Sequence, residues 1–492
     1  MNTLFPFALA IPEGIYFSAF LVFLFLGVIL FLNILRQKEG RYAFPAAVHV
    51  AAGVLAILAR DIMTLLVAWE VLAFSAFILI RGTGTARGRR ISLRYLVIQV
   101  TGGVFFFFAA LLHFGETGSL VTGILVPSAQ PFMVAAILIK TATMPVHFWL
   151  TQAYPSVELS ITPLLSVYTT KVGVLTAAQL IWISPAGFPV LAWLGAGTAV
   201  GAVILALLQH EARKLLSYHI VSQVGYMVAG IGLAAGFSAM AATAGMFHLV
   251  THTLYKALLL LVAAQAVHHR GHEDLTRMGG LGSRRPLLLL CGIIGAAAIS
   301  GVPFTSGYAS KYLLKEASQA QPLVTYLLYA ASVGTGLSFI KFTHLLFFNR
   351  ANPPSSDPSK TRAPSMVPLV LVAGITVLIG LFPHAVPGVP RRAFFTPSSL
   401  LSALLPLAAS ALLWMVLKKR LTRPATTVGR AGTGAGGVHA TDTRAKPFPG
   451  KAHAPGTRLR RGARTLHNLG PQAQVLLFLL VLAVTAGLLW PR

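Results

Sequence analysis

The segment 135–150, AAILIKTATMPVHFWL, decides the fold because it sets Lys140 inside an apolar run, five residues before Pro145. A charge near the centre of a bilayer costs roughly 2.5–3.5 kcal/mol, so a lysine there needs partners or a hydrated path. Proline removes a backbone donor and interrupts the helix, which is tolerated where the freed carbonyls face protein or water. The segment therefore predicts a broken helix inside a membrane protein, with a lysine beside the break.

The rest of the chain has the composition of an all-α polytopic membrane protein. It is 55% hydrophobic and 10% charged, its mean hydropathy is +0.74, and its apolar runs approach the roughly 20 residues that cross a bilayer. We expect about fourteen spans, at 13–36, 42–60, 61–81, 94–114, 131–150, 162–182, 187–208, 211–235, 239–266, a broken one at 286–316, 323–348, 366–387, 398–417 and 474–490. Lys and Arg gather in alternate loops, which predicts that both termini lie on the outer side of the membrane.

The net charge of +27 does not indicate a nucleic-acid partner, because much of it lies in one segment. Residues 418–470 are rich in Lys, Arg, Gly, Pro and Thr and lack apolar periodicity, which is typical of a mobile cytoplasmic loop. We expect this loop to touch anionic lipid; docking to a soluble partner is the alternative.

The single cysteine, Cys291, excludes an all-cysteine iron–sulfur site. The sequence indicates no cofactor, no metal and no catalytic or redox site of its own.

Glu70, in LLVAWEVLAFSAF (65–77), is the one acidic residue near the middle of an expected span. A lone buried carboxylate needs a cation, and Lys140 is the natural candidate. The pair has two interpretations, namely a functional switch or a static ion pair that orients two helices.

Four more titratable residues lie in apolar segments. Lys171 is mid-span in VYTTKVGVL (167–175), and FHLVTHTLYKALLLL (247–261) aligns His248, His252 and Lys256 along one helix face. Because histidine titrates at about pH 6.5, such a row can pass protons through intervening waters. Metal binding is the weaker interpretation, since lysine is a poor ligand and no carboxylate is near.

The stretch ISGVPFTSGYASKYLLKEA (299–317) repeats the pattern of the Lys140 segment. Gly301, Pro303 and Gly307 interrupt a hydrophobic run just before Lys311, and two interrupted segments in one chain are typical of a transporter built from paired repeats. Lys341, in SFIKFTHLLFF (338–348), lies near the cytoplasmic end of its span, where we expect its side chain to snorkel to the interface.

Four motifs in order, 140–156, 210–227, 247–261 and 300–314, resemble the antiporter-like, proton-conducting subunits of respiratory complex I, Mrp-type sodium/proton antiporters and membrane-bound hydrogenases. The resemblance covers about 42–348 and includes the Trp69–Glu70 pair and the 31-residue separation of Lys140 from Lys171. One departure is that the family usually has WLPDA where this chain has WLTQA (149–153). A carboxylate near the cytoplasmic entrance is therefore missing.

The resemblance implies two inverted five-helix repeats, each with one broken helix, around a hydrated central axis. It implies that Glu70 pairs with Lys140, and that protons continue through Lys171 and His252 to Lys311. The expected organisation is N-terminal helices (1–60), a first repeat (61–208), a second repeat (209–348), C-terminal helices (349–417), the basic loop (418–473) and a final helix (474–490). The implied partners are related antiporter-like membrane subunits, redox subunits on the cytoplasmic side, and lipid of an energy-coupling membrane such as a bacterial inner membrane.

The sequence does not determine which energy source drives transport. A redox-driven proton pump is the main hypothesis; a sodium/proton antiporter subunit and a subunit of a bicarbonate- or carbon-dioxide-coupled complex are alternatives. A self-sufficient secondary transporter and a scaffold with an inactive channel belong to other classes. Sodium sites need clustered oxygen ligands, and a single central carboxylate suits protons better.

Overall fold

The computed structural model describes residues 8–37, 39–123, 125–180, 189–234, 237–349 and 365–422. Within these ranges the secondary structure is helical apart from isolated bridges. The helices are α1 (Gly14–Arg36), α2 (Gly40–Leu58), α3 (Ile62–Arg81), α4 (Ala86–Thr117), α5 (Gln130–Lys140), α6 (Phe148–Ala153), α7 (Ile161–Leu180), α8 (Pro189–Leu207), α9 (Ala212–Ala234), α10 (Ala239–Arg270), α11 (Leu275–Met278), α12 (Leu281–Arg284), α13 (Pro286–Ser300), α14 (Ser306–Ala317), α15 (Pro322–Thr343), α16 (Met366–Leu381) and α17 (Pro397–Leu421).

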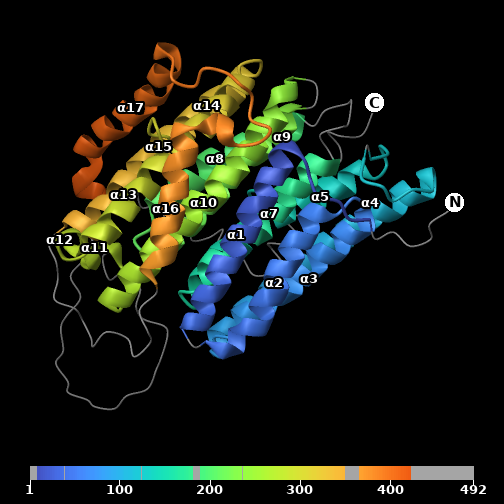
Figure 1. The fold of residues 1–492 in the computed structure, drawn as a ribbon, viewed down its shortest axis with the longest axis horizontal. Helices are drawn as coiled ribbons and strands as arrows, with labels where there is room; N and C mark the ends of the chain where they lie inside the picture. Colours follow the sequence, from blue (N-terminus) through green and yellow to red (C-terminus); the bar gives the residue numbers. More distant parts are fainter. Residues whose placement is uncertain are drawn as a thin grey trace, which may run out of the picture.

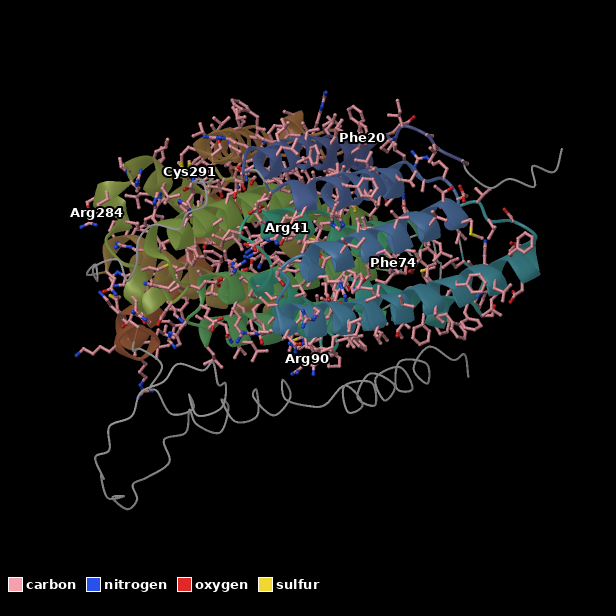
Figure 2. The ribbon with its side chains drawn as sticks, turned by 90° about the horizontal axis from the view of Figure 1, so that it is seen from below. Phe20, Arg41, Phe74, Arg90, Arg284 and Cys291 are labelled. Atoms are coloured by element: carbon pink, nitrogen blue, oxygen red, sulfur yellow. The ribbon has the colours of Figure 1, made fainter. Side chains whose placement is uncertain are left out.

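Eight of the helices in the described ranges are long and apolar enough to cross a membrane, and α5, α13 and α16 are shorter apolar helices. Their outer faces carry large hydrophobic side chains, such as Phe74, which is 48% exposed and lies on the outside of α3 (Figure 2). Arg90 and Arg284 extend from the edge of the molecule instead (Figure 2). An apolar surface of this extent requires a lipid environment, so the chain is an integral membrane protein.

The bundle is organised around α10. Figure 1 shows α1 to α5 on one side of the molecule and α13 to α17 on the other, with α10 between them. Helix α10 packs against α1, α7, α9, α13, α14 and α16, and its apolar window is entirely buried. A helix enclosed on all sides can carry titratable side chains only towards protein or internal water. The titratable row on α10 therefore lies in the interior of the protein.

Two helices of the bundle are interrupted. Helix α5 ends at Lys140 and α6 begins at Phe148, with Pro145 between them; α13 ends at Ser300 and α14 begins at Ser306, with Pro303 between them. Each interruption holds a residue other than glycine in the left-handed region, Ala142 (φ 55°) and Phe304 (φ 67°). Such a conformation persists where the surrounding structure enforces it, so both breaks are built features of the fold.

Helix bounds follow the expected spans, with two clear differences. Helix α4 begins at Ala86, eight residues before the predicted 94, because Thr85 caps the helix by accepting from Gly88 N and the arginines beyond the apolar run stay exposed. Helix α16 ends at Leu381 instead of 387, where the segment Pro383–Ala385 turns into a short 3₁₀ helix. The basic loop expected from residue 418 begins later, because α17 continues to Leu421. The rest of that loop and the expected span 474–490 lie outside the described residues.

Candidate functional site

Lys140 lies at the last position of α5, fully buried beside the first break. Its ammonium group donates a hydrogen bond to the carbonyl oxygen of Trp69 (3.1 Å) and lies 4.6 Å from the centre of the Trp69 ring. The carbonyl of Ile139, which the break leaves without a helical partner, accepts a hydrogen bond from Trp149 Nε1 (3.0 Å). The polar groups at the break are thus satisfied by contacts with other segments, as a buried helix end requires.

Glu70 lies next to Trp69 on α3, but the expected ion pair with Lys140 is not formed in this structure. The carboxylate atom Oε1 is buried, lies against Gly103 of α4, and has no hydrogen-bond partner among the described residues. Glu70 and Lys140 nevertheless interact electrostatically. The two side chains are therefore neighbours that do not form an ion pair in this structure.

Lys171 lies in the middle of α7 and is fully buried. Its ammonium group donates to the carbonyl of Ser166 (2.5 Å), and the hydroxyls of Thr169 and Thr170 beside it have no partners among the described residues. Two residues further on, Gly173 packs against the side-chain stem of Lys140. A Cβ atom at position 173 would stand 3.0 Å from the Cβ and Cγ atoms of Lys140. Helix α7 therefore packs against the end of α5 at Gly173, while Lys171, two residues away, leaves the helix on the opposite side.

His248, His252 and Lys256 follow one another along the buried interior of α10. The rings of His248 and His252 are 6.2 Å apart, and neither nitrogen of His252 nor the ammonium group of Lys256 has a hydrogen-bond partner among the described residues. Both His252 and Lys256 interact electrostatically with Lys171. This row therefore continues from α7 into the centre of the protein, and unsatisfied buried groups of this kind call for internal water.

Lys311 lies on α14, just after the second break, and is nearly fully buried. Its ammonium group donates to the carbonyl of Ile299 (2.6 Å), which belongs to the last turn of α13, and lies 5.1 Å from the centre of the Tyr226 ring. The preceding residue, Ser310, is bonded to His248 Nδ1 (3.0 Å) and accepts from Thr251 (2.9 Å). The histidine row is therefore connected to the second break by hydrogen bonds.

The structure thus brings Lys171, His248, His252, Lys256 and Lys311 into one electrostatically connected row. Glu70 and Lys140 interact with each other and form a separate group; α5, which carries Lys140, packs on α7, which carries Lys171. Lys341 is the exception: its ammonium group is buried and donates to the carbonyls of Leu207 (2.8 Å) and Gln209 (2.6 Å), at the C-terminal end of α8. Lys341 lies near the end of α15, as expected. Its side chain does not snorkel to solvent, because its ammonium group binds carbonyls at the C-terminal end of α8.

Three buried titratable residues close to the lysines and histidines described above were not identified from the sequence. His49 on α2 is bonded to Ser75 (2.9 Å) and interacts with Lys140; His219 on α9 is bonded to Ser338 (2.7 Å) and interacts with Lys256 and Lys311. Lys315 follows Lys311 by one helical turn. The lone histidines give no periodic signal in the sequence, whereas the four-residue spacing of Lys315 could have identified it.

The chain is similar in sequence to known membrane proteins. A family model described as NADH:quinone oxidoreductase/Mrp antiporter, transmembrane, matches residues 59–338. A Na⁺/H⁺ antiporter subunit from Alkalihalophilus pseudofirmus is 29% identical over 71% of this chain and 74% of the relative. An NADH-ubiquinone oxidoreductase chain 5 from Cryptococcus neoformans is 27% identical over 64% of this chain, which spans half the length of that relative.

A solved structure shares the fold. A chain in the membrane-bound sulfane sulfur reductase, an archaeal respiratory membrane complex, matches with a TM-score of 0.71 and 20% identity, over 96% of this chain and 84% of that one. The likeness extends beyond the residues that carry the four motifs, so the two chains share a fold over nearly the whole of this chain.

Proposed function

The chain belongs to the NADH:quinone oxidoreductase/Mrp antiporter transmembrane family, and from that premise we propose that it is a proton-translocating subunit of a multi-subunit membrane complex. Protons would move from the Glu70–Lys140 end of the row through Lys171, His252, Lys256 and His248 to Lys311. The relatives named above are a subunit of a Na⁺/H⁺ antiporter and a chain of an oxidoreductase, which supports membrane partner subunits.

One observation supports the proposal: buried lysines lie beside both broken helices and on the helices between them, and none of their ammonium groups is paired with a carboxylate of the described residues. Lys140, Lys171 and Lys311 donate to carbonyl oxygens, and Lys256 has no hydrogen-bond partner in the same ranges. Several unpaired like charges in a low-dielectric interior repel one another strongly, so they cannot all be protonated at once. A row that always contains a neutral member can accept a proton, which is the property a relay needs.

The Glu70–Lys140 pair would act as the switch of this relay. When the pair closes, the negative charge favours a proton on Lys140; when it opens, as in this structure, that proton is released more easily towards Lys171. The separated carboxylate and the carbonyl contact of the ammonium group correspond to the open arrangement. The switch involves charge and proton movement, without covalent chemistry.

Proton flux can be measured without knowledge of the natural energy source. The complex that contains this chain would be reconstituted in vesicles with trapped pyranine, and a potassium diffusion potential with valinomycin would drive proton uptake. We expect Lys140→Ala and Lys311→Ala to abolish uptake in assembled complexes, and Lys419→Met, at an exposed lysine near the end of α17, to leave it intact. Normal uptake in both interior variants would exclude the relay.

We infer that redox chemistry in partner subunits supplies the energy, in line with the chain 5 relative. A sodium/proton antiporter is the second candidate, and the antiporter relative supports it because the match spans more of that protein. The subunits that co-purify with the chain separate the two: iron–sulfur or nickel proteins indicate a pump, and a complex of membrane subunits alone indicates an antiporter.

A further inference from the structure

We propose that Lys315 is the last proton carrier of this chain, receiving protons from Lys311 and delivering them to the predicted outer side between α14 and α17. The proposal rests on the proposed proton pathway and adds its outlet. Lys315 is conspicuous because it is a second buried lysine on the same face of the same half-helix.

Lys311 and Lys315 are four residues apart on α14, so their side chains leave the helix on one face, roughly 5–6 Å apart at Cβ. The ammonium group of Lys315 lies 4.2 Å from the centre of the Tyr329 ring and has no hydrogen bond to the described residues. The two lysines also repel each other electrostatically. This spacing suits transfer of a proton through one intervening water better than simultaneous charge on both.

Such a water has a place to bind. A cavity of about 10 Å³, lined by Lys311, Lys315, Tyr312 and Ser402 among others, lies between the second break and α17. That volume corresponds to about one water molecule, and its lining offers the polar partners that a water needs. Helix α17 covers the cavity, because Ser402 and Pro406 contribute to its wall.

The surroundings of Lys315 also indicate an outlet. The next residue, Glu316, forms an ion pair with Arg392 (2.6 Å) in the link between α16 and α17. Arg391 and Arg392 are the exception to the charge asymmetry of the loops, since they lie on the predicted outer side. The ion pair gives Arg392 a partner on the predicted outer side. It also places two charged, partly exposed side chains just beyond Lys315. A proton leaving Lys315 therefore meets a polar boundary and not lipid.

A structural role for Lys315 would need only a positive charge against Tyr329, whereas a carrier must also lose its proton. Arginine separates these roles because it keeps the charge and cannot be deprotonated in proteins. Histidine keeps the capacity to exchange a proton but has a different shape. The matched set is therefore Lys315→Arg, Lys315→His and Lys315→Met, with Lys419→Met as the surface control.

The vesicle assay described above tests the proposal on the full chain in its complex, with Lys140→Ala measured in parallel. We expect uptake in Lys315→Arg and Lys315→Met to fall to the level of protein-free vesicles, and Lys315→His to retain part of it. Where Lys315→Met does not assemble, the arginine variant decides, because it preserves the charge. Full uptake in Lys315→Arg overturns the inference while Lys140→Ala remains inactive; full uptake in Lys140→Ala as well overturns the proton pathway itself.

Discussion

The carboxylate of Glu70 lies directly against Gly103, so that a Cβ atom at position 103 would stand 1.7 Å from Oε1 and 2.7 Å from the carboxyl carbon. Helix α4 therefore provides the space that the Glu70 side chain occupies while it is separated from Lys140. Gln99, one turn earlier on α4, is fully buried, and both of its amide atoms lack partners among the described residues. Gly103 thus leaves a recess on α4 that the Glu70 carboxylate occupies.

This recess gives the first prediction. Gly103→Ala should displace the end of the Glu70 side chain and reduce proton uptake, while the complex still assembles. Replacement of a helical glycine by alanine favours the helix by about 1 kcal/mol, so thermal stability should not fall. Gly115→Ala is the matched control, because it lies on the same helix and an added Cβ there meets nothing within 4 Å. Equal uptake in the two variants would show that the position of the carboxylate does not matter.

A second prediction concerns Glu39, in the link between α1 and α2. Burial raises the pKa of the Glu39 carboxyl and the nearby Glu158 raises it further, while the hydrogen bond donated by Ser160 lowers it. A carboxyl whose pKa is higher in the folded state supports folding at low pH, and this support is lost as the pH rises through the folded value. Glu39→Gln should therefore raise the melting temperature at neutral pH, and the gain should shrink on acidification towards about pH 5. A gain that increases on acidification would contradict the assignment.

The third prediction concerns an ion pair at the start of α9. Arg213 donates from Nε to Glu273 Oε1 (2.8 Å) and from Nη1 to the carbonyl of Val157 (2.5 Å) and the hydroxyl of Thr162 (3.2 Å). Arg213→Met leaves Glu273 without its partner; because Glu273 is 22% exposed, the cost should be smaller than the roughly 3–5 kcal/mol of a fully buried pair. We expect a clear loss of thermal stability in the purified complex.

Lys214→Met serves as the neighbour control for this variant, since Lys214 takes part in no ion pair among the described residues. Adding Glu273→Leu to Arg213→Met should recover part of the lost stability, because the unpaired carboxylate is then removed. A double variant as unstable as the single one would indicate that the backbone contact to Val157 carries the effect.

The sequence was sufficient to predict where most helices begin and end, because apolar length and helix breakers act locally. The span expected at 13–36 is the helix Gly14–Arg36, and the lysine before Pro145 ends α5. The row on α10 was also predictable, because residues four apart share a helix face whatever surrounds them. That α10 lies at the centre of the bundle depends on its packing with six other helices, which periodicity does not record.

The details of the site depend on contacts between distant segments. Lys140 binds the carbonyl of Trp69, 71 residues away, and a backbone carbonyl leaves no mark in a sequence. His219 meets Ser338 across 119 residues, and a lone histidine in an apolar run more often reflects a satisfied core residue. Lys315 is different, since its spacing from Lys311 was visible but its burial beneath α17 was not.

The last prediction distinguishes a switch from a static pair at Glu70 and Lys140. Glu70→Gln removes the charge that favours a proton on Lys140, so proton uptake should fall although the complex assembles. Lys140→Met alone removes the cation that acts electrostatically on Glu70, which should lower thermal stability. The double variant Glu70→Gln with Lys140→Met removes both charges, so it should regain stability without regaining uptake. Melting temperature and vesicle uptake, measured on the same preparations, test both parts. Uptake restored in the double variant would show that neither residue carries protons and would leave a static contact between α3 and α5 as the better account.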